Sequence, residues 1–269
     1  MRAEPLDYRH RTTLFSLLCF AGDLTRAEHQ LRALGQESEE AAQGATIYEQ
    51  VLRANRTREA VLRGELPGQF MLSEPACAAS QRQVIRCVAS GDLAGAEEAL
   101  RESARLWPAC PVQCGELTGV LRDVDDRVAP FAELFVNGEY VWLPWEQLRS
   151  LRVPRPVQLR DLIWAPVVVE LDAGPLQAFM PVLYPETGAA ADELTRLGRV
   201  TVFRDNEFGL TLGQGARLLA LQPASAEEPA PVHDLPLLEV DRITRMAGAG
   251  GGTDPGLQVI ATGTYGADA

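Results

Sequence analysis

The sequence predicts an α+β protein in two parts, in which tetratricopeptide-like helical hairpins precede a small antiparallel β-rich domain with short helices. Three observations predict this: an internal repeat in the first hundred residues, alternating apolar residues after residue 110, and an Asn-Gly pair between two strand-like runs. The 269 residues include 46% hydrophobic side chains, enough for the core of one large domain or two modest ones.

The repeat relates residues 22–31, GDLTRAEHQL, to residues 91–100, GDLAGAEEAL. Their separation is close to twice the period of tetratricopeptide helix pairs, which is about 34 residues. In each copy we expect the glycine to end one helix and the following aspartate to cap the next. Apolar residues at helical spacing on both sides of each copy, and again over residues 47–61, predict about five helices before residue 108.

The first repeat is expected to be incomplete. Pro5 stands before Gly22 at the distance where such a repeat places its closing proline, so residues 1–4 are expected to be the stub of a helix. Two explanations stay open: the true start lies further upstream, or this part of the repeat has been lost.

Residues after 110 have the pattern of strands. Alternating apolar residues predict a hairpin around Asn137-Gly138, the pair preferred in tight turns, and further strands between residues 165 and 221. Pro144 is expected to open a short helix. We therefore expect three regions: a helical domain over 1–110, an α+β domain over 111–222, and a low-complexity, mobile tail over 223–269.

Composition excludes several classes of protein. The net charge of -12 argues against nucleic-acid binding, which depends on a cationic surface. All 25 basic residues are arginine, which excludes Schiff-base chemistry and lysine-dependent phosphate sites, and there are only three histidines. No apolar run is long enough to span a membrane, and the N-terminus is not a secretory signal. We expect a cytoplasmic protein without cofactor, membrane insertion or enzymatic activity.

The five cysteines are scattered and odd in number, which predicts reduced thiols. Cys110 and Cys114 have a spacing that could begin a zinc site, but no second pair of ligands follows. Buried or loop thiols are therefore the favoured interpretation, and no metal site is predicted.

The densest charged motif is LRDVDDRVAPF, residues 121–131. Asp123, Asp125 and Asp126 could form a carboxylate cluster for a divalent cation, or a general acid–base pair. Apolar residues at helical spacing in the same segment instead suggest one or two helical turns whose aspartates face outward. Structural ion pairing at the domain junction is the favoured interpretation, ahead of metal binding, catalysis and partner contact.

Two further clusters have a structural and a functional interpretation. Trp142, Trp145 and Trp164 would be binding hot spots if exposed, but the alternation of their strands favours the core for most of them. The middle helix carries a basic face formed by Arg53, Arg56, Arg58 and Arg63. Solvent exposure is the favoured interpretation of this face, and docking of an acidic partner helix is the alternative.

The sequence resembles the ImpE/TagJ family, accessory components of bacterial type VI secretion systems. The resemblance runs from about residue 4 to 221, and its longest stretches are LFSLLCFAGDLTRAEHQL (14–31) and GELTGVLRDVDDRVAPFAELFVNGEYVWLPWEQLRSL (115–151). Ten residues match the central motif of the family: Asp123, Asp125, Asp126, Arg127, Pro130, Glu133, Gly138, Tyr140, Trp142 and Pro144. The helix that usually precedes the first stretch is missing, and nothing is carried onto the chain beyond residue 222.

The resemblance implies a non-enzymatic adaptor. Family members associate with an amphipathic N-terminal helix of the small sheath subunit, and are linked to the hexameric ATPase that disassembles the contracted sheath. The candidate partner-binding residues are Asp123, Asp125, Asp126, Arg127, Glu133, Tyr140, Trp142 and Trp145. Two alternatives stay open: a metal-dependent hydrolase that uses the three aspartates, and a structural scaffold that dimerises through the incomplete first repeat.

Overall fold

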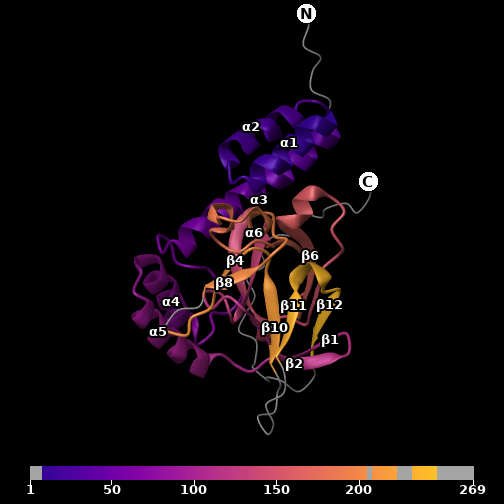
Figure 1. Ribbon diagram of the computed structural model, residues 1–269. Helices are drawn as coiled ribbons and strands as arrows, with labels where there is room; N and C mark the ends of the chain where they lie inside the picture. Colours follow the sequence, from indigo (N-terminus) through magenta and orange to yellow (C-terminus); the bar gives the residue numbers. More distant parts are fainter. Residues whose placement is uncertain (1–7, 205–207, 223–231, 247–269) are drawn as a thin grey trace, which may run out of the picture.

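The computed structural model describes residues 8–204, 208–222 and 232–246. Two helical hairpins flank a long central helix, with the first hairpin at one end of the molecule and the second beside the sheet (Figure 1). The helices of this part are α1 (Tyr8–Phe20), α2 (Leu24–Leu34), α3 (Glu39–Leu62), α4 (Ala78–Ser90) and α5 (Leu93–Leu106).

Both hairpins have the turn that the repeated sequence predicts. Gly22 follows α1 and Gly91 follows α4, with φ angles of 73° and 79°, a left-handed conformation that glycine adopts without strain. Asp23 and Asp92 then cap α2 and α5, each by accepting a hydrogen bond from the backbone N–H three residues later. Because α3 packs against the sheet between the two hairpins, tetratricopeptide-like stacking of all five helices stays a prediction.

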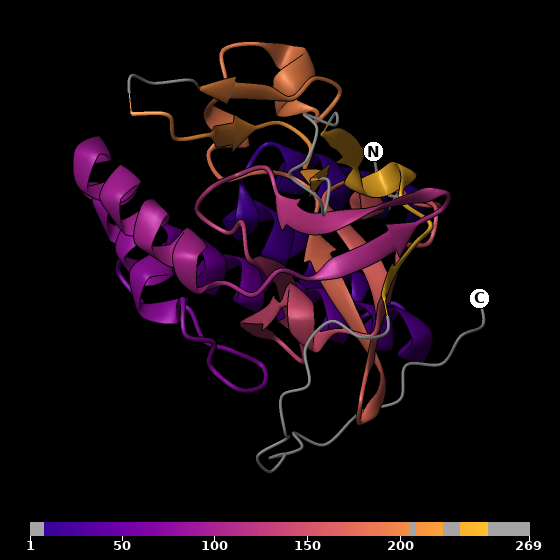
Figure 2. The ribbon, with the colours of Figure 1, turned by 90° about the horizontal axis from the view of Figure 1, so that it is seen from below.

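The rest of the described chain builds an antiparallel sheet that curls (Figure 2). Its ten strands follow the order β11-β10-β2-β1-β12-β5-β6-β7-β3-β4. The strands are β1 (Pro111–Cys114), β2 (Leu117–Asp123), β3 (Phe131–Val136), β4 (Glu139–Pro144), β5 (Ser150–Arg152), β6 (Trp164–Leu171), β7 (Gly174–Pro181), β10 (Leu218–Gln222), β11 (His233–Pro236) and β12 (Arg242–Arg245). Strands β8 (Val202–Arg204) and β9 (Leu212–Gln214) form a separate pair beside helix α6 (Glu193–Arg196). The 3-10 helices are η1 (Trp145–Gln147), η2 (Leu159–Leu162), η3 (Thr187–Ala189) and η4 (Leu237–Glu239). The predicted α+β class is confirmed.

The predicted end of the folded region at residue 222 is wrong. β12 lies inside the ten-stranded sheet, where it pairs with β1 on one side and β5 on the other, and its Ile243 is fully buried. Composition did not reveal this strand, because four residues gain their hydrogen bonds from neighbours that are remote in sequence. The remaining parts of the predicted tail, and the predicted N-terminal helix stub, lie outside the described residues. The division into domains at residue 110 stays a prediction.

The predicted hairpin around Asn137-Gly138 joins β3 to β4. Both residues have positive φ, 49° and 82°, as a two-residue turn that follows the twist of the strands requires. Pro144 ends β4 and precedes the short 3-10 helix η1, where the sequence predicts a short helix. These local signals were sufficient because each conformation is set by the residue that adopts it.

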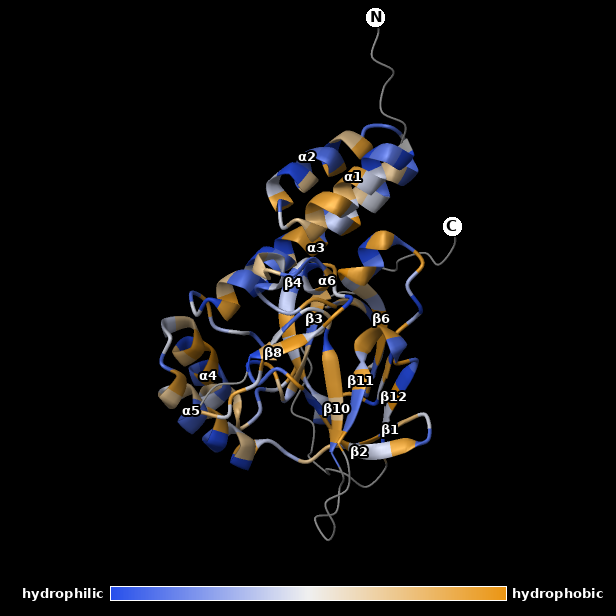
Figure 3. Ribbon diagram, viewed as in Figure 1, coloured by the Kyte–Doolittle hydropathy of each residue, from blue (hydrophilic) through white to orange (hydrophobic). Residues whose placement is uncertain are grey.

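Two large hydrophobic clusters stabilise the fold, and a third, small one lies in the second hairpin. One lies on the inner face of the sheet and includes the hydrophobic strand β10 (Figure 3). The second joins the first three helices to the other face of β3 and β4, through contacts among Val51, Leu52, Phe131 and Trp142. The sequence predicts that most of Trp142, Trp145 and Trp164 lie in the core, and all three are buried, at 0–2% exposure. Helices and sheet therefore share one apolar interface.

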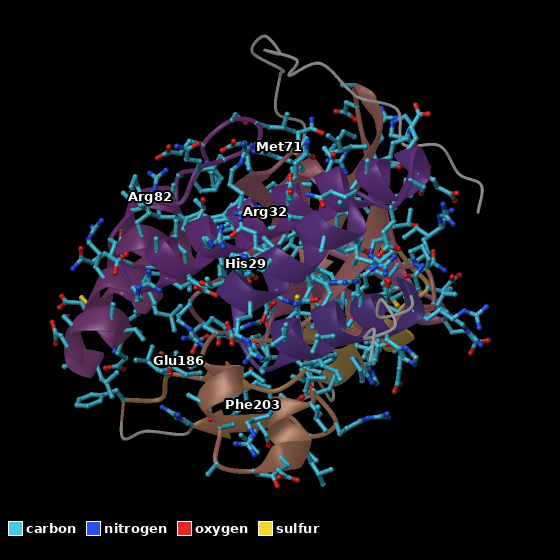
Figure 4. The ribbon with its side chains drawn as sticks, turned by 90° about the horizontal axis from the view of Figure 1, so that it is seen from above. His29, Arg32, Met71, Arg82, Glu186 and Phe203 are labelled. Carbon is cyan, nitrogen blue, oxygen red and sulfur yellow. The ribbon has the colours of Figure 1, made fainter. Side chains whose placement is uncertain are left out.

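The loop before α4 covers the outer edge of β4. Met71 donates its backbone N–H to the Trp142 carbonyl, and Trp142 donates its own to the Gln69 carbonyl. Arg82 of α4 lies over the Phe70 ring and bonds the Gly68 carbonyl, and Figure 4 shows Met71 and Arg82 on the same side of the molecule. An edge strand that would otherwise be open to pairing with another chain is thereby protected.

We expect Gly68→Ala to destabilise the fold. A Cβ at residue 68 would lie 2.1 Å from Cη2 of Trp142, an indole that is fully buried and stacked on Phe131. Relieving this overlap should lower the free energy of unfolding by about 1–3 kcal/mol. Gly44→Ala in α3 is the matched control, because nothing lies near its added Cβ and alanine favours the helix. Urea denaturation measures both, and equal stabilities would contradict the packing described.

Candidate functional site

The aspartate motif forms a buried turn. β2 ends at Asp123, and the chain then turns inward before β3 begins. The side chains of Asp123, Asp125 and Asp126 are 0–3% exposed, so the predicted helical turns with outward-facing aspartates are wrong. The favoured interpretation of the same residues as structural ion pairs agrees with the geometry, because each carboxylate has an arginine partner.

Two of these ion pairs join residues of the motif to each other. Asp125 accepts hydrogen bonds from Arg127 Nε and from the backbone N–H of Gly213, each at 2.9 Å. Asp126 pairs with Arg122, four residues earlier. The turn is therefore fixed both to itself and to β9.

The third pair belongs to a chain of charges that joins the sheet to the helices. Arg217, which is fully buried just before β10, pairs with both Asp123 and Glu133. Arg58 of α3 reaches the same Glu133, with Nε 2.8 Å from Oε1 and Nη2 3.1 Å from Oε2. We call these four residues the junction network. A bidentate contact of this kind fixes the orientation of both side chains.

Hydrogen bonds extend the junction network into β4. The Tyr140 hydroxyl donates to Glu133 Oε1 at 2.5 Å, and Trp142 Nε1 donates to the Tyr140 oxygen at 2.6 Å. The second hairpin is attached separately: Gln81 of α4 donates to the Asp126 carbonyl at 2.6 Å, and Ser103 of α5 donates to Gln81. Trp145 lies apart from this network and donates to a backbone carbonyl.

Burial and neighbouring charge act differently on the two carboxylates of the junction network. Burial tends to raise the pKa of Glu133, but Arg58 and Arg217 outweigh it and hold that pKa well below its usual range. Asp123 has Arg217 as its ion-pair partner, and burial raises its pKa to about 6. Glu133 is therefore ionised at neutral pH, whereas Asp123 titrates close to neutral pH.

Asp123 should make stability depend on pH. Its pKa of about 6 lies above the value of about 4 in an unfolded chain, so the folded state binds the extra proton. The contribution is therefore fully present below pH 4 and is lost as the pH rises through 6. We expect the free energy of unfolding from this group to fall between pH 4.5 and 7, and Asp123→Asn to reduce that slope. Urea titrations of both proteins at several pH values measure it, and identical slopes would contradict the assignment.

All eight predicted partner-binding residues are buried, with exposures of 0–4%: Asp123, Asp125, Asp126, Arg127, Glu133, Tyr140, Trp142 and Trp145. Their observed contacts are internal, and a role in partner contact stays a prediction. Sequence reasoning missed Arg217 and placed Arg58 on a solvated face, although Arg58 is 6% exposed. The one available signal for Arg217 was a lone arginine in an otherwise apolar strand.

The described residues contain no group of three or more His, Cys, Asp and Glu side chains placed to hold a metal ion. The five cysteines are free thiols, and burial raises the pKa of Cys110 to about 11 and that of Cys19 to about 12. Thiols with such pKa values are protonated at neutral pH and react slowly.

An apolar hollow of about 170 Å³ lies between α3 and the outer face of the sheet. We call it the α3 hollow. Its walls come from α3, β3, β6, β7 and the loop after β5, and its apolar members are Ile47, Val51, Phe135, Pro154, Pro166, Val167, Val168, Ala178 and Phe179. No signal in the sequence predicts this hollow, because five separate segments of the chain meet there.

Comparison with known proteins agrees with this architecture. The family model described as ImpE protein matches residues 115–242, which span β2 to the start of β12. The type VI secretion system accessory component TagJ of Pseudomonas aeruginosa is 37% identical over 218 residues, covering 80% of this chain and 76% of TagJ. The chain belongs to the ImpE/TagJ family. The family resemblance read from the sequence is thereby confirmed, and with it an accessory role in type VI secretion.

A crystal structure of a protein from Vibrio parahaemolyticus has the same fold. Its TM-score is 0.78 at 22% identity, over 89% of this chain and 87% of that one. Among the residues that the structure describes, no helix is both long and apolar enough to cross a membrane.

Proposed function

We propose that this ImpE/TagJ protein is a non-enzymatic cytoplasmic adaptor that binds the amphipathic N-terminal helix of the small sheath subunit and links the sheath to its disassembly ATPase. The observation that carries the proposal is the 37% identity to the accessory component TagJ over four-fifths of the chain. The family resemblance supplies the two partners, and the fold supplies surfaces suited to helices.

The chemistry of the site favours binding over catalysis. The carboxylates of the family motif form ion pairs with arginines inside the protein, which gives these carboxylates a structural role. Paired helices and an adjoining apolar hollow suit helix-in-groove recognition, which requires apolar anchors and no reactive groups. A single helix buries a modest interface, so we expect a Kd in the micromolar range or somewhat below.

The test is a titration of the full chain with a fluorescent peptide that spans the N-terminal helix of the small sheath subunit. We expect saturable binding of this peptide and no binding of a scrambled peptide. Equal behaviour of the two peptides, with a protein shown to be folded by circular dichroism, would contradict the proposal.

Divalent cations distinguish the adaptor from the metal-dependent hydrolase. We expect no shift in the melting temperature with millimolar Mg²⁺, Mn²⁺ or Ca²⁺, because Asp123, Asp125 and Asp126 are buried and each is paired with an arginine. A ligand that binds only the folded state must raise its stability. A rise of several degrees that Asp125→Asn abolishes would favour the hydrolase.

A further inference from the structure

The described residues between 185 and 214 form a small lobe at one side of the molecule (top of Figure 2). The lobe contains η3, α6, β8 and β9. Thr211 donates its backbone N–H to the Asp126 carboxylate at 2.6 Å. Gly213 donates its own to the Asp125 carboxylate at 2.9 Å. The aspartate turn therefore holds the lobe in a fixed position.

Apolar side chains are concentrated on the outside of this lobe. In the described parts of the chain eleven large apolar side chains are exposed, and four of them fall between residues 194 and 202. We call these four residues, each 41–53% exposed, the lobe face: Leu194, Leu197, Val200 and Val202. Single exposed apolar residues are normal on a protein surface, whereas a group of them marks an interaction surface.

The first three residues of the lobe face are held together by the end of α6. Leu197 follows Leu194 by three residues, a spacing that places both side chains on one side of a helical turn. The backbone N–H groups of Arg199 and Val200 bond the Leu194 carbonyl, at 2.8 and 3.4 Å. The chain that leaves α6 therefore returns to Leu194 and brings Val200 beside it.

The fourth residue continues the same surface along β8. The Thr201 hydroxyl donates to a backbone carbonyl of the lobe at 2.7 Å, and the Phe203 ring packs edge-on against Tyr184. Successive side chains of an extended chain point to opposite sides. Because Thr201 and Phe203 point inward, Val200 and Val202 lie on the outer side.

The lobe face has an acidic end and a basic end. Glu193 precedes its first residue, and Arg204 follows its last residue. Their side chains are 85% and 61% exposed. Within the chain, Glu193 meets Arg196 at 3.7 Å and Arg204 meets Glu186 at 3.9 Å. Exposed pairs at such distances contribute little, so both side chains can meet charges of another molecule.

We propose that two copies of this chain associate through their lobe faces about a two-fold axis. In such a contact the start of the face in one copy lies against its end in the other, so Glu193 lies next to the partner's Arg204. This self-complementary order of charges, on both sides of an apolar centre, identifies a second copy as the occupant. The inference goes beyond the proposed function, because it involves neither the α3 hollow nor the first repeat.

The size of the lobe face predicts a weak dimer. Four half-exposed side chains bury less than the about 800 Å² per partner of a standard interface. Sedimentation equilibrium of the full chain, from micromolar to millimolar concentration, should therefore show a reversible equilibrium between monomer and dimer. Leu197→Asp should weaken this dimer by about tenfold or more, because it places a carboxylate in an apolar contact. Val157→Asp is the matched control, the same change at an exposed apolar residue after β5, and should leave association unchanged.

Charge reversal tests the predicted arrangement of the two copies. Glu193→Arg and Arg204→Glu each place like charges across the two-fold axis, and each should weaken the dimer by about fivefold. The double variant Glu193→Arg/Arg204→Glu should restore association to within about twofold of the wild type. A change in fold stability alone would not produce such a rescue, because the two residues lie at opposite ends of the face.

Three results would overturn the proposal: a monomer at millimolar concentration, equal effects of Leu197→Asp and Val157→Asp, or no rescue in the double charge reversal. If Leu197→Asp fails to fold, the charge variants, which change only exposed side chains, still decide. The sheath-peptide titration is independent of this association, so its failure alone would contradict only the proposed function.

Discussion

A chain that ends at Gln222 is expected not to fold, whereas a chain that ends at Met246 is expected to unfold like the full-length protein. The shorter chain loses β11, η4 and β12, and β12 supplies the hydrogen bonds between β1 and β5 in the middle of the sheet. It also removes Leu237, Val240 and Ile243 from the core of the inner face. The longer chain keeps every element that the structure describes.

Circular dichroism and thermal unfolding of the two truncated chains measure this effect. The expected result is a cooperative transition for the chain that ends at Met246 and its absence for the chain that ends at Gln222. Two equally cooperative transitions would mean that the last strands are dispensable, and would restore the boundary predicted from composition.

Glu133→Gln is expected to lower the free energy of unfolding by about 3–5 kcal/mol, because it leaves the buried guanidinium of Arg58 without a counter-charge and that of Arg217 with one of its two. Arg58 and Arg217 both lose their pair with Glu133, and Arg217 keeps only Asp123. Tyr140, which donates to the same carboxylate, loses a charged acceptor.

Glu139→Gln is the matched control for this variant. Glu139 lies on the adjoining strand β4 and pairs with Arg53, but its side chain is 60% exposed. Solvent screens such a pair, so we expect a change of at most about 0.5 kcal/mol. Chemical denaturation of the two variants gives both values, and a Glu133 variant as stable as the control would show that the junction network contributes little.

The features that the sequence predicted well are helix ends, helix caps and turns, which depend on local residues. Gly22 and Gly91 need left-handed backbone, Asp23 and Asp92 accept from the N–H groups that follow them, and Asn137-Gly138 specifies a hairpin turn. In each case the residue that gives the signal also adopts the conformation. Alternation along β4 likewise placed Tyr140 and Trp142 on one face of the strand, and both are buried.

Contacts between segments that are remote in sequence could not be predicted from the sequence alone. Apolar spacing around the aspartates fitted a helix as well as a turn, and what selects the inward turn is Arg217, 94 residues from Asp123. The sequence suggested that Arg58 is one of several solvated arginines. In the structure its Nε lies 2.8 Å from Oε1 of Glu133, a residue 75 positions away in sequence. The α3 hollow likewise forms only where segments that are remote in sequence meet.

The contacts of the family motif that the structure shows are internal. Its charged and aromatic residues hold helix α3 to the sheet. Substitution of a buried motif residue should therefore weaken partner binding in proportion to lost stability, and no further.

A double-mutant cycle between Arg58 and Glu133 tests this role of the junction most directly. Arg58→Met, Glu133→Gln and the double variant are compared with the wild type by urea denaturation. A direct buried pair predicts a coupling free energy of about 1–3 kcal/mol, with the double variant more stable than the sum of the single losses allows. Additive losses, within about 0.5 kcal/mol, would show that helix α3 and the sheet are not joined through this pair.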